Sequence, residues 1–273
     1  MRAMLPAKKR LGQNFLTAES VAKRITDAIS PGPGDLVFEI GPGRGALTVP
    51  LARSGASVVA YEIDGALVDL LREKFATSSN VEISYGDIRT VDFDEAARER
   101  GRTGYKLAGN IPYNLTGTIL IDLARWRMLS AAVLMVQREV GDRILTEPGE
   151  RNCGILSIFL QTYFIMKRVL KVRPGSFTPP PKVESVVLGF APHTPGRGPE
   201  DRGAFLQFLK GCFSHRRKKL RNILGELLDV ETAKDWDRLG ELSGVDFGKR
   251  PEELSLESWF ELFAASRRVK GLR

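Results

Sequence analysis

The tetrapeptide Asn110-Ile111-Pro112-Tyr113 combines residue types that could activate an amino group on a planar base. The lone pair of such an amine is delocalised into the ring, so its nitrogen is a poor nucleophile. The Asn110 side-chain oxygen and the Ile111 carbonyl oxygen can both accept hydrogen bonds from it, which favours a pyramidal, reactive nitrogen. Pro112 biases Ile111 toward an extended backbone, and Tyr113 offers a face for stacking. The alternative is an ordinary Asn/Pro turn with a core tyrosine.

A glycine-rich turn lies upstream, within residues 38–46, between an expected strand and an expected helix. Gly41 and Gly43 remove side-chain bulk where backbone can approach a nucleotide-bearing cofactor. With Ala46 they also satisfy the pattern G-x-G-x-x-G/A of dinucleotide-binding folds. The turn alone therefore leaves NAD and S-adenosylmethionine as alternatives, together with a tight turn that binds no ligand.

Two acidic residues end the next two expected strands. Glu62 can accept hydrogen bonds from ribose hydroxyls, and Asp87 can accept one from an adenine amine. Taken alone, Glu62 could be a solvated strand-end acid and Asp87 part of a structural turn. Because the ends of parallel strands gather at one sheet edge, the three elements together favour adenosine and hence S-adenosyl-L-methionine. The neighbouring Ile63 and Ile88 complete the predicted cofactor site.

The strands and helices that must position these residues alternate along the chain. From about residue 35 to 190, short β-branched runs alternate with amphipathic segments, which predicts an α/β fold with a doubly wound sheet. Seven strands are expected, at residues 36–40, 57–62, 81–85, 106–109, 131–137, 163–169 and 183–190. Apolar spacing predicts helices at residues 46–54, 65–76, 116–126 and 138–145. A further helix is expected at residues 17–29, with Thr17 as its N-cap.

Proline, glycine and polar residues interrupt the pattern at residues 191–199, where nothing can pack a core. We therefore predict a cofactor-binding catalytic domain over residues 1–192 and a helical RNA-binding domain over residues 200–273. Helical periodicity within the second domain occurs at residues 201–213, 218–228, 231–239 and 256–268.

Composition limits the partners and the compartment. A formal net charge of +8 and a pI near 9.6 favour a polyanion such as RNA, DNA or an anionic membrane surface. Cys153 and Cys212 lie far apart without partners at metal-ligand spacing, so neither a metal nor a disulfide is expected. No run approaches the ~18 apolar residues of a membrane span, and no apolar segment follows the basic N-terminus. We expect a cytoplasmic protein.

A dense basic cluster lies in the C-terminal region and consists of Arg216, Arg217, Lys218, Lys219 and Arg221. Phosphate contacts from such a cluster would bind RNA in a salt-dependent manner. A solvated helix face is the alternative. The cluster is included in the predicted RNA-binding site because a catalytic edge alone is too small to recognise a structured RNA.

A stiff, proline-rich loop precedes the last expected strand. Its sequence, Phe177-Thr178-Pro179-Pro180-Pro181, suits a fixed loop at a substrate mouth, and it could hold Phe177 against a base flipped out of its stack. The alternative is a connector in which Phe177 belongs to the core.

Taken together, the motifs resemble the bacterial ribosomal RNA small-subunit adenine dimethyltransferase family, which is associated with kasugamycin sensitivity. The resemblance covers nearly the whole chain. The matching segments are residues 12–16, 38–48, 62, 86–87, 110–114, 176–185 and 213–222. Ile111 replaces the leucine usual in the family, which matters little if only its carbonyl acts. His215 replaces a frequent glutamine.

The resemblance implies a Rossmann-like class I methyltransferase fold with a seven-stranded sheet and a small C-terminal all-α domain. It implies methylation of two adjacent adenosines, twice each, in the 3'-terminal hairpin of 16S rRNA within a 30S precursor particle. It also implies Phe177 as a second aromatic opposite Tyr113. Cofactor contacts are implied for Asn14, Leu16, Gly41, Glu62, Asp87 and Asn110.

Three other functions remain open at this stage. A nicotinamide-dependent oxidoreductase could use the same glycine turn, although it would have no use for an amide and an aromatic at the fourth strand. An assembly module could keep the fold without turnover, on a ribosome precursor or on DNA. A large-subunit methyltransferase of the macrolide-resistance type shares the motifs, but residues 213–222 and Phe177 favour the small-subunit family. Nothing in the sequence demands more than a monomer.

Overall fold

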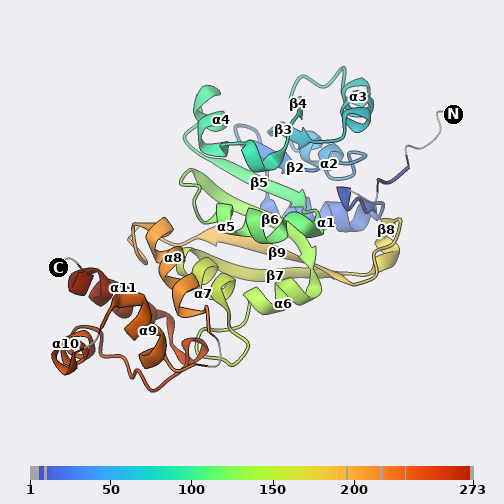
Figure 1. Ribbon diagram of the computed structural model, residues 1–273. Coiled ribbons are helices and arrows are strands. Elements are labelled where there is room, and N and C mark those ends of the chain that lie inside the picture. The colour runs from blue at the N-terminus through green and yellow to red at the C-terminus, as the bar shows by residue number, and fades with distance from the viewer. Residues whose placement is uncertain (1–5, 9–10, 195, 216–217, 231, 271–273) are drawn as a thin grey trace. The chain divides into compact units, whose positions relative to one another are not determined.

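Seven strands form one mixed sheet in the order β4-β3-β2-β5-β6-β9-β7, shown in Figure 1. Neighbouring strands are parallel from β4 to β6, whereas β9 runs antiparallel to both β6 and β7. The strands are β2 (Leu36–Ile40), β3 (Ser57–Glu62), β4 (Val81–Tyr85), β5 (Tyr105–Asn110), β6 (Leu129–Gln137), β7 (Phe164–Val172) and β9 (Ser185–Pro192). The predicted α/β fold with seven strands is confirmed.

This computed structural model describes residues 6–8, 11–194, 196–215, 218–230 and 232–270. Its helices are α1 (Glu19–Ile29), α2 (Thr48–Arg53), α3 (Gly65–Lys74), α4 (Phe93–Glu99), α5 (Thr116–Leu123), α6 (Arg138–Ile144), α7 (Ile155–Tyr163), α8 (Arg202–Cys212), α9 (Leu220–Leu228), α10 (Ala233–Ser243) and α11 (Leu256–Lys270). Single 3₁₀ turns cover Ile88–Thr90, Tyr113–Leu115, Pro174–Ser176 and Pro251–Glu253.

The chain divides into two compact units. One comprises residues 1–141 and 164–192, and the other comprises residues 142–163 and 193–273. The second unit therefore includes α7 as well as the C-terminal helices, whereas the sequence-based division into 1–192 and 200–273 follows the chain linearly and stays a prediction. Within the second unit, Trp259 is fully buried and stacks with Phe213 at 5.7 Å between ring centroids.

Helix α1 covers one face of the sheet and forms much of the first unit's core. Its buried residues Val21 and Ile25 pack in one cluster with Val37 of β2, Ala108 of β5 and Met135 of β6. Strand β2 is buried along its whole length, as expected for a central strand that is covered on both faces. This packing positions the carboxyl ends of β2 and β5, which carry the residues of the candidate site.

The expectation that Thr17 caps α1 is wrong. The N-cap position is Ala18, which has no side chain that could cap the helix. The Thr17 amide and hydroxyl both donate to the Ser176 carbonyl, at 2.8 and 3.1 Å. Thr17 follows a two-residue strand β1 (Phe15–Leu16) that pairs with β8 (Phe177–Thr178). This pairing, between segments distant in sequence, places the Thr17 side chain against Ser176 and not over the start of the helix.

Candidate active site at the carboxyl edge of the sheet

The predicted cofactor residues and the tetrapeptide line one pocket at the carboxyl ends of β2, β3, β4 and β5. This is the edge at which open α/β sheets bind ligands. The predicted residues that line the pocket are Asn14, Leu16, Gly41, Gly43, Glu62, Ile63, Asp87, Ile88, Asn110, Ile111, Pro112 and Tyr113. Segments separated by up to a hundred residues thus converge on one site.

The glycine turn after β2 requires the backbone freedom of its glycines. Gly41 and Gly43 have φ values of 63° and 58°, in the left-handed region that disfavours other residues. A Cβ atom added to Gly43 would lie 3.0 Å from the Phe15 ring. The turn therefore keeps backbone exposed to the pocket in a way that a side chain would prevent, which fits a nucleotide-bearing cofactor.

Glu62 ends β3 and organises the turn beside it. Its Oε2 accepts from the Gly43 amide at 3.1 Å, and its Oε1 accepts from the Ile63 and Asp64 amides at 3.0 Å each. A carboxylate can accept about four hydrogen bonds, so some capacity remains for a ribose hydroxyl. Burial raises the pKa of Glu62 above its usual value, and these three amides oppose that shift.

Asp87 and two isoleucines line the adenine side of the predicted cofactor site. The Asp87 carboxylate accepts from the Arg89 side chain and from its amide, and the side-chain hydrogen bond from Arg89 lowers the pKa of Asp87. Asp87 is therefore held ionised and able to accept. Ile63 is large and apolar, yet its side chain is 41% exposed. Such an exposed apolar side chain is suited to packing against a flat ring of a ligand.

Asn110 is oriented by its partner. Its Nδ2 donates to the Asn14 backbone carbonyl at 3.0 Å. Because a carbonyl can only accept, this contact assigns the amide nitrogen to that side and leaves Oδ1 as an acceptor. The Ile111 amide donates to the Met135 carbonyl at 3.1 Å, which ties the tetrapeptide to β6. The Ile111 carbonyl oxygen accepts no hydrogen bond from the described residues.

Tyr113 is held at both ends. Its backbone begins a 3₁₀ turn after Pro112, whose φ is −54°. Its phenol oxygen lies 3.0 Å from the Ser185 hydroxyl at the start of β9. The ring itself is partly exposed and lines the pocket. Ser185 lies in the matching segment 176–185, but no role was predicted for it.

Glu39 is a pocket residue that sequence reasoning missed. It is the last residue but one of β2, is 1% exposed, and lines the pocket with a buried Oε2 that has no partner among the described residues. Burial raises the pKa of Glu39 to about 8. A buried carboxyl with open hydrogen-bond capacity fits a pocket for a cationic ligand. The position of this acid just before the glycine turn could have identified Glu39 as a pocket residue from the sequence.

The N-terminal segment also contributes to the pocket. Lys8 Nζ and Gln13 Nε2 donate to the two oxygens of Asp64, at 2.7 and 3.1 Å. The Arg44 guanidinium lies over the Phe15 ring, 4.3 Å from its centroid. These contacts fix the segment that carries Asn14, so they support the orientation of Asn110.

Two predicted groups lie elsewhere. Phe177 is 3% exposed, belongs to the core cluster of α1 and does not line the pocket. Its position corresponds to the alternative interpretation as a core residue. Arg216 and Arg217 lie outside the described residues. Lys218 pairs with Glu226 at 3.1 Å, Lys219 is exposed, and the Arg221 guanidinium lies over the Trp236 ring.

The described part of the chain offers neither a metal-binding cluster nor a membrane-spanning helix. The described residues contain no group of three or more His, Cys, Asp or Glu side chains that could hold a metal ion. Helices within the described ranges lack the combination of length and apolar composition that a bilayer crossing requires.

The fold and the pocket define a class of protein. A seven-stranded sheet in which only the last strand, β9, is antiparallel to its neighbours, with a glycine turn after β2 and an acid at the end of β3, is the fold of class I S-adenosylmethionine-dependent methyltransferases. The family model described as Ribosomal RNA adenine dimethylase matches residues 4–265. The chain belongs to this ribosomal RNA adenine dimethylase family.

Curated relatives agree over nearly the full length. Ribosomal RNA small subunit methyltransferase A of Geobacter sulfurreducens is 44% identical over 261 residues, which cover 94% of each chain. The relative of the same name from Burkholderia pseudomallei is 37% identical, with 97% of this chain and 96% of that one covered. The family resemblance predicted from the sequence is confirmed.

Solved structures support the same fold. A dimethyladenosine transferase from Plasmodium falciparum is similar with a TM-score of 0.76 and 24% identity, covering 93% of this chain and 98% of that one. The 23S rRNA methyltransferase ErmE is similar with a TM-score of 0.69 and 25% identity, covering 93% and 100%.

Proposed function

We propose that this chain transfers methyl groups from S-adenosylmethionine to the N6 amines of two adjacent adenosines in the 3'-terminal hairpin of 16S rRNA. Family membership supports adenine dimethylation of ribosomal RNA, and the names of its relatives support the small subunit. The observation that carries the proposal is the Asn110 amide, whose nitrogen is occupied by Asn14 so that its oxygen remains available to an amine.

The pocket residues fit the cofactor that the family uses. Gly41 and Gly43 leave backbone open, and Glu62 keeps acceptor capacity for ribose hydroxyls. Asp87 would accept from the adenine amine, with Ile63 and Ile88 against the ring. The buried Glu39 Oε2, which has no partner among the described residues, suits a ligand that carries positive charge. When bound, the cofactor supplies a methyl group on a sulfonium with a neutral leaving group.

The residues of the tetrapeptide would act on the target amine. Asn110 Oδ1 and the Ile111 carbonyl oxygen would accept hydrogen bonds from its two protons, which localises the lone pair on nitrogen. Tyr113 would stack on the base and hold it in line with the methyl group. No general base is required, because the methylated nitrogen releases its extra proton to water after the transfer, so positioning supplies most of the rate.

RNA binding would extend beyond the pocket. The basic residues Lys218, Lys219 and Arg221, together with Arg216 and Arg217, would neutralise phosphates, so affinity should fall as salt rises. The proposed partner is 16S rRNA in a 30S precursor particle, and the proposed acting species is a monomer. We expect it to act in the cytoplasm, where bacterial ribosomal subunits are assembled.

A large-subunit substrate is the second candidate, because a 23S rRNA methyltransferase shares the fold at 25% identity. The 44% identity to a small-subunit methyltransferase favours the first candidate. The test is incubation with undermethylated 30S particles, free 16S rRNA and 23S rRNA, using labelled S-adenosylmethionine and nucleoside mass spectrometry. We expect dimethyladenosine in 30S particles. Dimethyladenosine confined to 23S rRNA, or RNA binding without methylation, would overturn the proposal.

A further inference from the structure

The start of β9 brings an unexpected side chain to the active edge. Strand β9 is antiparallel to β6, so its first residue lies where the parallel strands end. Asn110 is in register with Met135, and Gln137 of the same strand β6 is in register with Ser185. The reversal in the sheet therefore places Ser185 two strands away from β5, at the edge that carries Asn110.

Ser185 is a polar residue in an apolar place. It is 0% exposed, and it lies opposite Val172 in β7, which belongs to the hydrophobic cluster of α1. A hydroxyl buried among apolar groups needs a hydrogen-bond partner. For the Ser185 Oγ that partner is the Tyr113 phenol at 3.0 Å, from a residue 72 positions earlier in the chain.

The phenol of Tyr113 also needs an explanation. Stacking on a base requires only an aromatic face, which phenylalanine would supply equally well. The hydroxyl of Tyr113 is engaged with Ser185 and not with another pocket residue among those described. With Pro112 restraining the backbone and Ser185 bonded to the phenol oxygen, the long axis of the Tyr113 side chain is held at both ends.

We propose that Ser185 is a positioning residue, which fixes the Tyr113 ring in the orientation needed to hold the target base for methyl transfer. Sites of this kind depend on orientation to within about 10 to 20 degrees, so a side chain whose phenol end is free to swing would lower the rate more than it lowers binding. This inference rests on the proposed function, because it takes the stacking role of Tyr113 from it.

The test is a double-mutant cycle with Ser185→Ala and Tyr113→Phe. Each single variant should lower kcat on 30S particles about 5- to 30-fold, the range expected when one buried hydrogen bond is lost. The double variant should be no worse than the worse single variant, because both remove the same contact. The dissociation constant for S-adenosylmethionine should change less than about twofold, because the hydroxyl pair holds only the ring.

Ser157→Ala is the matched control. The Ser157 hydroxyl is equally buried and donates to the Arg143 carbonyl at 2.6 Å, and Ser157 does not line the pocket. We expect this variant to lower the melting temperature while kcat stays unchanged. If Ser185→Ala proves too unstable to measure, Tyr113→Phe carries the test alone, since it removes the contact without emptying a buried position.

The outcomes separate two failures. An inactive wild-type protein would overturn the proposed function and this inference with it. An active wild type with losses that multiply in the double variant would overturn the inference alone. So would a Tyr113→Phe variant with normal kcat, or a Ser185→Ala variant that weakens cofactor binding as much as turnover.

Discussion

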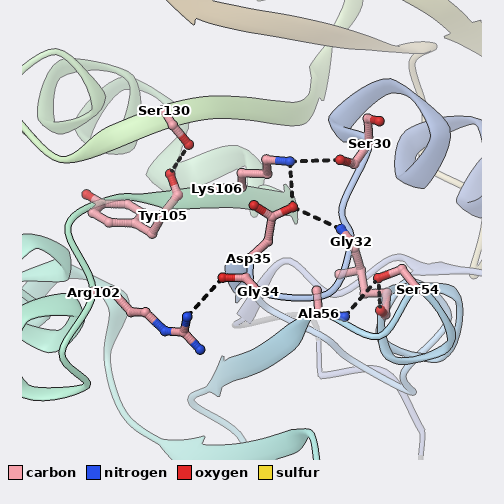
Figure 2. A network of polar contacts seen from close by, with 11 residues as sticks. Ser30, Gly32, Gly34, Asp35, Ser54, Ala56, Arg102, Tyr105, Lys106 and Ser130 are labelled. Carbon is pink, nitrogen blue, oxygen red and sulfur yellow. Dashed lines mark hydrogen bonds and ion pairs between the residues drawn. The ribbon is translucent and has the colours of Figure 1, made fainter.

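The two edges of the same sheet use similar polar residues in opposite ways. At the amino edge, Lys106 donates to Asp35 at 2.8 Å and to the Ser30 carbonyl at 2.7 Å, and Asp35 also accepts from the Gly32 amide (Figure 2). At the carboxyl edge, Glu39 keeps a buried oxygen without a partner among the described residues, and Asn110 keeps its side-chain oxygen as an acceptor.

The difference teaches how this fold separates stability from function. Polar groups at the amino edge satisfy one another, so they hold strands β2 and β5 together and offer little to a ligand. Polar groups at the carboxyl edge are oriented by the backbone but keep open capacity. Buried groups of that kind cost stability, which a bound ligand can recover. Substitutions at the two edges should therefore change different measurements.

The largest expected effect is on turnover, from Asn110→Ala. Loss of one preorganised hydrogen-bond group at the reacting atom costs about 100- to 1,000-fold in kcat. We expect this loss with a melting temperature close to that of the wild type, measured by single-turnover methylation and by thermal unfolding. Near-normal turnover would refute the role of the amide.

Asn80→Ala is the control for that variant. Asn80 is also a partly buried asparagine, but its amide donates to the Ala52 and Ala56 carbonyls at 2.8 and 2.9 Å, away from the pocket. Its removal should lower stability and leave turnover unchanged.

The next effect concerns Tyr113→Ala. Base stacking contributes about 1 to 3 kcal/mol, so kcat/KM should fall roughly 10- to 100-fold. Because the ring holds the base, the dissociation constant for S-adenosylmethionine, measured by calorimetry, should change far less. Equal losses in both quantities would argue against stacking.

Glu39→Gln should change how the free energy of unfolding depends on pH. The pKa of Glu39 is raised from 4.5 to about 8, so the unliganded protein holds it protonated, and ionisation costs stability as pH rises from 4.5 to 8. The variant should match the wild type near pH 4.5 and exceed it increasingly as pH rises, by up to about 5 kcal/mol above pH 8, since each unit of raised pKa corresponds to about 1.4 kcal/mol. Urea unfolding across this range measures the difference. If the difference in unfolding free energy between the variant and the wild type did not change with pH, the raised pKa of Glu39 would be contradicted.

The smallest effect is expected at the amino edge, from Lys106→Met. Asp35 is partly exposed and solvent screens the pair, so the loss should be about 1 kcal/mol or less, with kcat unchanged. The hydrogen bond from Lys106 lowers the pKa of Asp35 below its usual 3.8. Its stabilisation is therefore present above pH 3.8 and is lost as pH falls through the lowered pKa. Unfolding at neutral and acid pH, with turnover as control, checks this.

Local patterns in the sequence were enough to predict the sheet and most of the pocket. The glycine turn, Glu62, Asp87 and the tetrapeptide each follow an expected strand, and parallel strands bring such ends together. All seven expected strands are present, with boundaries shifted by up to a few residues.

Long-range contacts explain what the sequence could not supply. Helix α7 was missed because none of its residues is exposed, so no polar face marks the segment as a helix. Thr17 and Phe177 depend on the pairing of β1 with β8, between segments about 160 residues apart. The contact of Ser185 with Tyr113 likewise depends on the antiparallel strand β9.

The most direct test of the central claim is calorimetric titration of S-adenosylmethionine and of NAD into the wild type, Glu62→Gln and Asp35→Asn. We expect S-adenosylmethionine to bind the wild type and Asp35→Asn with equal affinity. It should bind Glu62→Gln at least about tenfold more weakly, because a charged acceptor is lost. We expect no binding of NAD to any of the three proteins. Binding of NAD alone, or an equal loss of affinity from substitutions at the two edges, would contradict the central claim.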